Sequence, residues 1–232
     1  MEYVFAPEPT TALHVAGSQQ RFAVRRVYCV GRNYAAHARE MGSDPTRELP
    51  FFFCKPADAV MTANPGETIA INYPGLTKNF HHEVELVVAI GKAGSNIPVE
   101  QAHEHVYGYA VGLDMTRRDL QGVMKESGKP WEIGKAFDQS APIGALHPVS
   151  GTGVLQHAAI WIQVNGKDRQ RSNIDQMSWS VPEIISHLSG YFELKPGDLI
   201  MTGTPEGVGA VQVGDLLEGG IDGLGTLRVR IA

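Results

Sequence analysis

Two glutamates, Glu83 and Glu85, have the residue type and spacing that most directly suggest chemistry in this sequence. They alternate with aliphatic residues through 82–90, the pattern of a β-strand, so both carboxylates point to the same face. Carboxylates placed side by side repel each other, and the pKa of each rises unless a cation lies between them. A solvated strand face has the same spacing. The opposite face is wholly aliphatic, as in a strand covered on both sides, and this favours a site for a divalent cation.

Asp114 supplies a third carboxylate, at the point where an apolar strand over 107–113 ends and a helix begins. The pattern predicts Thr116 as the N-cap of that helix, with Asp119 in its first turn, although Asp114 could itself serve as a cap. Three carboxylates without cysteine or clustered histidine suit a hard ion, Mg²⁺ or Mn²⁺ rather than Zn²⁺. We expect one such ion per chain. It takes six oxygens, so about three positions stay open for water or a chelating substrate.

Arg118, Gln121 and Lys125 follow Asp114 at spacings that place them on one face of the predicted helix. By itself this is an ordinary polar helix face. Beside a metal site, the same three side chains would provide contacts for the carboxylate and carbonyl oxygens of a substrate.

His37 and Glu40 stand three residues apart in a short helix predicted over 34–41, with Asn33 as its N-cap and Gly42 as its closing residue. At this spacing Glu40 can accept a hydrogen bond from one imidazole nitrogen and leave the other free as a base that activates water. A surface ion pair has the same spacing, so both interpretations stay open at this point.

The composition excludes several classes of protein. The 232 residues carry 20 Lys+Arg and 25 Asp+Glu, a formal charge of −5, whereas nucleic-acid-binding proteins show a basic excess or stripe. No apolar run approaches the ~20 residues that span a bilayer, and the N-terminus lacks the pattern of a signal peptide. Cys29 and Cys54 lie among apolar residues and fit buried thiols in a reducing compartment. We therefore expect a cytoplasmic protein with no nucleic-acid or membrane partner.

The elements that must position these residues are mainly strands. Glycine (26) and proline (14) are frequent and helical patterns are few, which favours a strand-dominated α+β fold with a rolled or barrel-like sheet. Asn165-Gly166 predicts a hairpin with a type I′ turn, and Ser180 with Glu183 predicts a capping box that opens a helix. Residues 1–22 are interpreted as a peripheral N-terminal arm and residues 23–232 as the catalytic domain.

Six blocks of the sequence, in this order, resemble those of the fumarylacetoacetate hydrolase family. They are GRNYAAHAREM (31–41), FFFCKP (51–56), HHEVELVVAIGK (81–92), GYAVGLDMTRRDLQ (108–121), GKAFDQSAPIG (134–144) and LKPGDLIMTGTPEGVG (194–209). The short length and the first block are similar to the bacterial acylpyruvate and fumarylpyruvate hydrolase branch of that family.

The resemblance implies a rolled, strand-dominated fold, usually dimeric, and a role for each candidate residue. Glu83, Glu85 and Asp114 match the metal ligands, and His37 and Glu40 match the water-activating dyad. The remaining matches are residues near the substrate: Arg118, Gln121 and Lys135 at its oxygens, Thr204 at a carboxylate, and Lys55 close to the site.

The activity implied is cleavage of the C–C bond of a 2,4-dioxo acid, most readily fumarylpyruvate, in the catabolism of aromatic compounds. An oxaloacetate decarboxylase, a keto-acid isomerase or hydratase, and a non-catalytic metal-binding module are the alternatives. Glu83→Gln or Asp114→Asn is expected to abolish turnover and to leave the metal-free protein folded, because either change removes repulsion. The second carboxylate of fumarylpyruvate would need a cation away from the metal, and Arg117, Lys125 and Lys129 are candidates.

Overall fold

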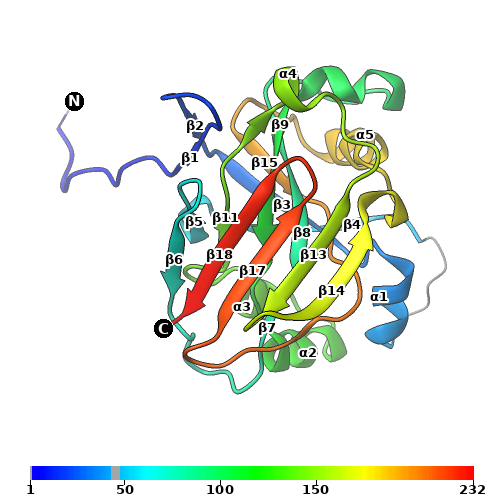
Figure 1. Cartoon of the computed structure of the whole chain (residues 1–232). Helices are drawn as coiled ribbons and strands as arrows, with labels where there is room; N and C mark the ends of the chain where they lie inside the picture. The colour runs from blue at the N-terminus through cyan, green and yellow to red at the C-terminus, as the bar shows by residue number, and fades with distance from the viewer. Residues whose placement is uncertain (1, 43–47) are drawn as a thin grey trace.

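The computed structural model describes residues 2–42 and 48–232, and strands make up most of its regular structure (Figure 1). The strands are β1 (Ala12–His14), β2 (Arg21–Ala23), β3 (Arg26–Gly31), β4 (Phe51–Lys55), β5 (Val60–Thr62), β6 (Thr68–Ile71), β7 (Phe80–His82), β8 (Val84–Ile90), β9 (Val106–Leu113), β10 (Thr116–Arg117), β11 (Ala141–Ile143), β12 (His147–Pro148), β13 (Ala159–Val164), β14 (Lys167–Asn173), β15 (Asp198–Met201), β16 (Gly209–Ala210), β17 (Leu216–Ile221) and β18 (Gly225–Ile231). The helices are α1 (Ala35–Glu40), α2 (Arg118–Glu126), α3 (Glu132–Lys135), α4 (Val149–Thr152) and α5 (Val181–Tyr191), with 3₁₀ turns η1 (Ala57–Ala59), η2 (Val99–His105) and η3 (Ile174–Gln176).

The largest sheet is mixed and runs in the order β4-β3-β15-β8-β9-β11-β5, with β12 paired to β9. Its pairs β3–β15 and β5–β11 are parallel, and β8 lies antiparallel to β9 and β15 at its centre. All seven residues of β8 are buried, as expected for a strand covered on both faces. Of the carboxylates predicted from the sequence, Glu85 lies in β8, Glu83 directly precedes β8, and Asp114 directly follows β9.

A second sheet, in the order β14-β13-β17-β18-β6, lies in front of the first in Figure 1. The aliphatic face of β8 contributes Val84, Leu86 and Val88 to one core cluster with Ile160 and Leu217 of the second sheet. One core cluster therefore lies between the sheets, and the opposite face of β8 carries Glu85 at the site and Val87 and Ala89 in a second core cluster. The predicted class, a strand-dominated α+β fold with a rolled mixed sheet and few helices, is confirmed.

Two predicted turns have the expected chemistry. The β13–β14 hairpin turns at Asn165 and Gly166, both with positive φ (52° and 73°), as a type I′ turn requires. Helix α5 opens with the reciprocal capping box of Ser180 and Glu183.

Two predicted helix caps are wrong. Asn33 does not cap α1, because its side chain is buried and binds Trp179 and the carbonyl of Thr202 instead. Thr116 does not cap α2, because its hydroxyl donates to the Asp114 carbonyl and accepts from Lys135. In both cases tertiary partners outcompete the local backbone for the side chain.

The first strands form a hairpin that packs on the body of the protein. β1 pairs with β2, and Leu13 is fully buried beside Val27 and Leu146. Residues 2–11 contain no strand or helix, and residue 1 of the predicted arm lies outside the described residues. The division into an arm of residues 1–22 and a domain of residues 23–232 stays a prediction.

Two further features bear on the class of protein. No helix in residues 2–42 and 48–232 has the length and apolar character to cross a membrane. Cys29 is a buried free thiol, as predicted, whereas Cys54 is exposed, because its side chain points out of strand β4.

Candidate active site

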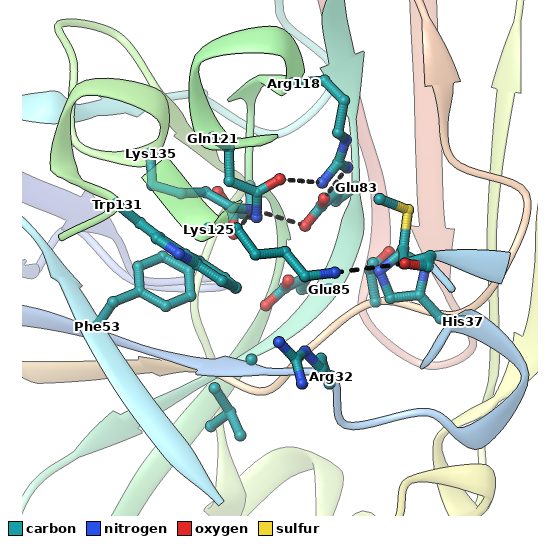
Figure 2. A pocket seen from close by; sticks show the side chains of 15 residues that line it. Arg32, His37, Phe53, Glu83, Glu85, Arg118, Gln121, Lys125, Trp131 and Lys135 are labelled. Atoms are coloured by element: carbon teal, nitrogen blue, oxygen red, sulfur yellow. Dashed lines mark hydrogen bonds and ion pairs between the residues drawn. The ribbon is translucent and has the colours of Figure 1, made fainter. Parts of the chain in front are cut away.

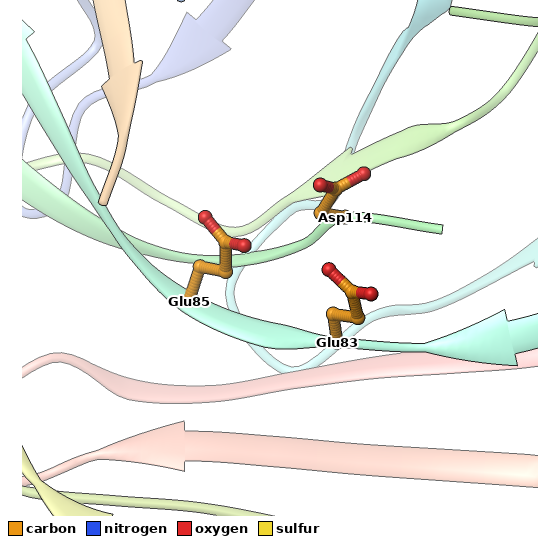
Figure 3. Close-up of side chains that lie close together, drawn as sticks. All are labelled: Glu83, Glu85 and Asp114. Atoms are coloured by element: carbon orange, nitrogen blue, oxygen red, sulfur yellow. The ribbon is translucent and has the colours of Figure 1, made fainter. Parts of the chain in front are cut away.

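The pocket floor consists of Glu83, Glu85 and Asp114, which the pairing of β8 with β9 brings together (Figure 3). The amide of Asp114 donates to the Glu83 carbonyl at 2.8 Å, and Glu85 lies opposite Gly112. The three carboxylates offer oxygens within 4.8 Å of one another, and all three side chains are buried. The alternation in the sequence therefore leads to one compact cluster.

Three buried cations, Lys135, Arg118 and Lys55, neutralise part of the floor, and Figure 2 shows the first two. Lys135 Nζ lies 2.8 Å from Glu83 Oε2, 2.7 Å from Asp114 Oδ2 and 2.7 Å from the Thr116 hydroxyl. Arg118 donates to Glu83 Oε1. Burial alone would raise the pKa of Glu83, but the charges of Lys135 and Arg118 outweigh it and hold that pKa well below its ordinary value.

Glu85 differs from the other two carboxylates because its described hydrogen-bond donor is the neutral amide of Gly203, at 2.8 Å. Burial raises the pKa of Glu85 well above its ordinary value, and the charges of Asp114 and Glu83 raise it further. Lys55 Nζ lies 2.8 Å from Asp114 Oδ1 without hydrogen-bond alignment, so this buried oxygen has no hydrogen-bond donor among the described residues. A hard divalent cation would provide a partner for buried carboxylate oxygens that have a single neutral donor or no hydrogen-bond donor. The floor thus fits the predicted Mg²⁺ or Mn²⁺.

The dyad, His37 and Glu40, lies on α1 beside the same pocket. His37 Nδ1 is 3.1 Å from Glu40 Oε2, and the imidazole is buried and lines the pocket. The amide of Gly207 donates to both oxygens of Glu40, at 3.0 and 3.1 Å. A proton on Nδ1 directed at this carboxylate leaves Nε2 as the acceptor, the arrangement a general base needs.

Gln121 and Thr204 also line the pocket, and their partners limit what each can offer. The Gln121 amide oxygen accepts from Arg118 at 2.6 Å, which leaves its NH₂ group as donor. The Thr204 hydroxyl donates to the Val84 carbonyl at 2.8 Å, so a carboxylate would meet the Thr204 backbone N–H. Their predicted substrate contacts stay predictions.

Lys55 is placed behind the floor rather than in the pocket lining. It is fully buried, contacts Asp114, and donates to the carbonyls of Met115 and Lys135. From this position Lys55 can connect the floor to α3, and it does not line the space that a substrate would occupy.

Sequence reasoning missed two glycines that position the site. Gly203 (φ 96°) supplies the amide to Glu85, and a Cβ there would lie 2.7 Å from Cβ of Asn33. Gly207 (φ 91°) supplies the amide to Glu40, and a Cβ there would lie 2.1 Å from the Arg169 carbonyl oxygen. Both conformations and both close approaches require glycine. Their signal was the repeated glycine in the block at 194–209.

The structure brings the predicted residues together in one pocket, apart from Lys55 behind the floor and Glu40 behind His37. It adds Arg32 and Trp131, which the sequence did not single out (Figure 2). The pocket is lined by Val30, Gly31, Arg32, His37, Met41, Phe53, Glu83, Glu85, Asp114, Arg118, Gln121, Lys125, Trp131, Lys135 and Thr204.

Comparison with known proteins agrees with this geometry. A family model described as the C-terminal part of fumarylacetoacetate (FAA) hydrolase matches residues 26–232. A fumarylpyruvate hydrolase of Ralstonia sp. is 46% identical over 188 residues, covering 81% of this chain and 95% of the relative. An oxaloacetate tautomerase of Rattus norvegicus is 42% identical over 207 residues, covering 89% and 91%.

Among solved structures, the fumarylpyruvate hydrolase of Pseudomonas aeruginosa in complex with Mn²⁺ and pyruvate is 65% identical to this chain. It superposes with a TM-score of 0.98 and covers 100% of this chain and 99% of its own. That neighbour holds an ion of the kind for which the three floor carboxylates are suited.

Proposed function

The chain belongs to the fumarylacetoacetate hydrolase family, and on that premise we propose that it is a metal-dependent hydrolase of 2,4-dioxo acids, with fumarylpyruvate as its substrate. The products are pyruvate and fumarate. One Mg²⁺ or Mn²⁺ per chain is held by Glu83, Glu85 and Asp114.

One observation carries this proposal: the carboxylate floor and the His37–Glu40 dyad meet in a single pocket. A floor alone would serve any reaction of a 2-keto acid, or a structural ion. A base held by a carboxylate beside that floor adds what hydrolysis requires, which is the removal of a proton from water.

The residues of the chain divide the reaction between them. When bound, the metal supplies a Lewis acid that stabilises negative charge on the oxygens of the pyruvate half. His37, held by Glu40, takes a proton from water as the hydroxyl adds to the distal carbonyl carbon. Gln121 stabilises the oxyanion through its NH₂ group, and Lys135, whose three N–H donors are engaged with Glu83, Asp114 and Thr116, contributes its positive charge. The C–C bond then breaks, the acid leaves, and the proton on His37 is available for the new methyl group of pyruvate.

The test is steady-state turnover of fumarylpyruvate, acetylpyruvate and oxaloacetate side by side, with Mg²⁺ and with Mn²⁺. Metal-dependent release of one pyruvate per acylpyruvate, abolished by EDTA and restored by either ion, is expected. Turnover of oxaloacetate alone would contradict the proposal.

Oxaloacetate chemistry is the second candidate, because the tautomerase of Rattus norvegicus is almost as similar to this chain as the Ralstonia hydrolase. Tautomerisation and decarboxylation of oxaloacetate need a metal floor but no attack by water. The dyad favours hydrolysis, and the ratio of the two rates in the same assay decides between the candidates.

We further propose a cytoplasmic homodimer that acts in the catabolism of aromatic compounds. The free thiols Cys29 and Cys54 support a reducing compartment. Dimer formation rests on the family resemblance, and a monomer in light scattering at micromolar concentration would contradict it.

A further inference from the structure

Two cations line the outer part of the pocket, apart from those that neutralise the floor. Lys125 reaches across from α2, and Arg32 enters from the turn between β3 and α1 (Figure 2). We call these two residues the rim pair. The floor cations Lys135 and Arg118 are engaged with Glu83, whereas both members of the rim pair line the pocket without belonging to the floor.

Arg32 is held in a backbone conformation that an arginine rarely adopts. Its φ is 57°, in the left-handed region, where glycine would carry no steric cost. Asn33 fixes the turn with three hydrogen bonds of 2.8–2.9 Å to Trp179 and Thr202. Strained residues of this kind cluster at functional sites. The strain here is explained if the guanidinium is needed in the pocket.

The described contacts of the Arg32 side chain leave its donors available. Its guanidinium carbon lies 5.5 Å from the centre of the Phe51 ring, and no hydrogen bond or ion pair of this guanidinium occurs within residues 2–42 and 48–232. The face of the arginine is therefore supported by an aromatic ring while its five N–H groups stay open to a planar anion.

The proposed substrate supplies such an anion. Fumarylpyruvate carries one carboxylate in its pyruvate half and a second at the end of its fumaryl half. The trans double bond keeps the second carboxylate away from the first, so the two cannot share one cation. A carboxylate at the far end of the pocket requires a cation or several donors there, because an unpaired buried charge is costly.

The other two cations considered from the sequence do not reach this place. Arg117 stacks on Phe137, 4.4 Å from the ring centre, and donates to the Ile133 carbonyl. Lys129 is exposed, and neither residue lines the pocket. Of the three original candidates only Lys125 remains, and Arg32 joins it.

We propose that the rim pair, Arg32 and Lys125, binds the distal carboxylate of the substrate and makes the enzyme selective for acylpyruvates with an acidic acyl group. This inference rests on the proposed function and names the substrate class of the same site. Arg32 provides the planar fork for two parallel hydrogen bonds, and Lys125 provides a second positive charge.

Lys125 also has a structural contact, since its Nζ lies 3.4 Å from the Met41 carbonyl at the end of α1. If structural contacts of this kind were the whole role of Lys125, its loss would disturb α1 and slow every substrate alike. A role in binding the distal carboxylate predicts a loss confined to substrates that carry one. Comparison of two substrates separates these roles.

The experiment measures kcat/KM for fumarylpyruvate and for acetylpyruvate, which lacks the distal carboxylate. Arg32→Gly should lower kcat/KM for fumarylpyruvate by about 10- to 100-fold, the range for loss of a charge-assisted hydrogen bond, mainly through KM. The value for acetylpyruvate should fall by no more than about threefold on the same scale. Lys125→Gln should give a smaller loss with the same selectivity, and Arg32→Lys should recover part of it.

Two controls keep the result specific. Glycine adopts the φ of residue 32 without strain, so Arg32→Gly should have a Tm equal to or above that of the wild type. Lys129→Gln removes an exposed cation near the end of the same helix and should leave both kinetic values unchanged. Equal losses for both substrates in Arg32→Gly, or no loss for fumarylpyruvate, would overturn the rim pair as the distal site.

If the proposed function itself is wrong, the experiment gives a different result. In that case the wild type hydrolyses neither acylpyruvate, and binding of fumarate in the presence of Mn²⁺ and pyruvate, measured by calorimetry, decides about the rim pair. At least fivefold weaker fumarate binding in Arg32→Gly would support the site, and unchanged binding would overturn it.

Discussion

The pocket floor and the dyad reach the same pocket by different structural routes. Of the floor residues, Glu85 lies in the central strand β8 of the large sheet, and Glu83 and Asp114 directly adjoin the paired ends of β8 and β9; all three are buried. The dyad lies on α1, a helix of six residues, and Glu40 is held by the amide of Gly207 from a distant loop. The sheet fixes the floor through its ladder of hydrogen bonds, whereas the dyad depends on a few individual contacts.

Chemistry and stability are coupled in the floor and largely separate in the dyad. Glu83 and Asp114 in the floor are buried in ion pairs, so removing either changes both the chemistry and the free energy of unfolding. The dyad residues pair with each other within one short helix and, among the described residues, hold no buried ion pair with the rest of the fold, so their removal should change the chemistry and alter the free energy of unfolding much less than removal of Glu83. Substitutions in the two regions should therefore have different combinations of effects.

The largest effect is expected in the floor itself. Glu83→Gln and Glu85→Gln should each reduce turnover to background, because each removes an oxygen ligand with its charge. Their stabilities in EDTA should differ. Glu83→Gln deprives the buried Lys135 and Arg118 of a partner and should lower the free energy of unfolding by ~3–5 kcal/mol, whereas Glu85→Gln should leave it unchanged or higher.

Urea unfolding of the two metal-free variants measures this difference. The buried ion pairs of Glu83 and Asp114 argue against the expectation from sequence that Glu83→Gln or Asp114→Asn does not destabilise the metal-free protein, and this experiment tests it for Glu83. Equal stability of both variants would mean that the ion pairs of Glu83 contribute nothing. Turnover near the wild-type rate at limiting Mg²⁺ in either variant would refute the metal site.

His37→Ala should have the next largest effect and should act on chemistry alone. Acylpyruvate hydrolysis should fall by the ~10²–10⁴-fold that loss of a general base costs. Binding of Mn²⁺ and of oxalate, measured by calorimetry, should persist, and any decarboxylation of oxaloacetate should fall less steeply. Equal loss of both activities would show that His37 does not act on water.

Glu40→Gln should give a milder form of the same split. The amide still meets the Gly207 N–H but loses the charge that holds His37 Nδ1–H, which costs about 10- to 100-fold in hydrolysis. The affinity for Mn²⁺ in calorimetry should be unchanged, because Glu40 holds the imidazole and not the floor. Loss of Mn²⁺ affinity together with activity would indicate a purely structural role for Glu40.

Local patterns in the sequence predicted this site well, whereas contacts between distant segments could not be predicted from the pattern. The alternation around Glu83 and Glu85 and the i, i+3 spacing of His37 and Glu40 are local patterns, and both lead to the geometry observed. The ion pairs of Lys55 and Lys135 with Asp114 join segments about 20 to 60 positions apart, and only the family resemblance indicated that those lysines lie near the site.

The helix caps failed for a related reason. Asn33 and Thr116 have the residue types of N-caps, and local propensity assigned them to their own helices. The fold offered each of them buried partners from elsewhere, Trp179 and Thr202 for Asn33 and Lys135 for Thr116. A side chain with two competing sets of partners cannot be assigned from its neighbours in sequence alone.

Asn33→Ala removes a hydrogen-bonded connection between the dyad helix and the floor and should have the smallest kinetic effect of these substitutions. The Asn33 side chain ties the turn before α1 to Thr202, which adjoins the Gly203 amide that donates to Glu85. Its loss leaves the buried Thr202 carbonyl and the Trp179 amide without this partner and should lower the free energy of unfolding by about 2–4 kcal/mol. Asn64→Ala is the matched control, because the Asn64 side chain donates a hydrogen bond to Glu67 at an exposed site and its loss should cost less than about 0.5 kcal/mol.

Well below the Tm of Asn33→Ala, hydrolysis should fall several-fold while the affinity for Mn²⁺ in calorimetry changes less, because the dyad and Arg32 depend on this turn and the floor is held by its own strands. If Mn²⁺ affinity and hydrolysis fell together by the same factor, the turn would support the floor as much as the dyad, and the two regions would have to be treated as one unit.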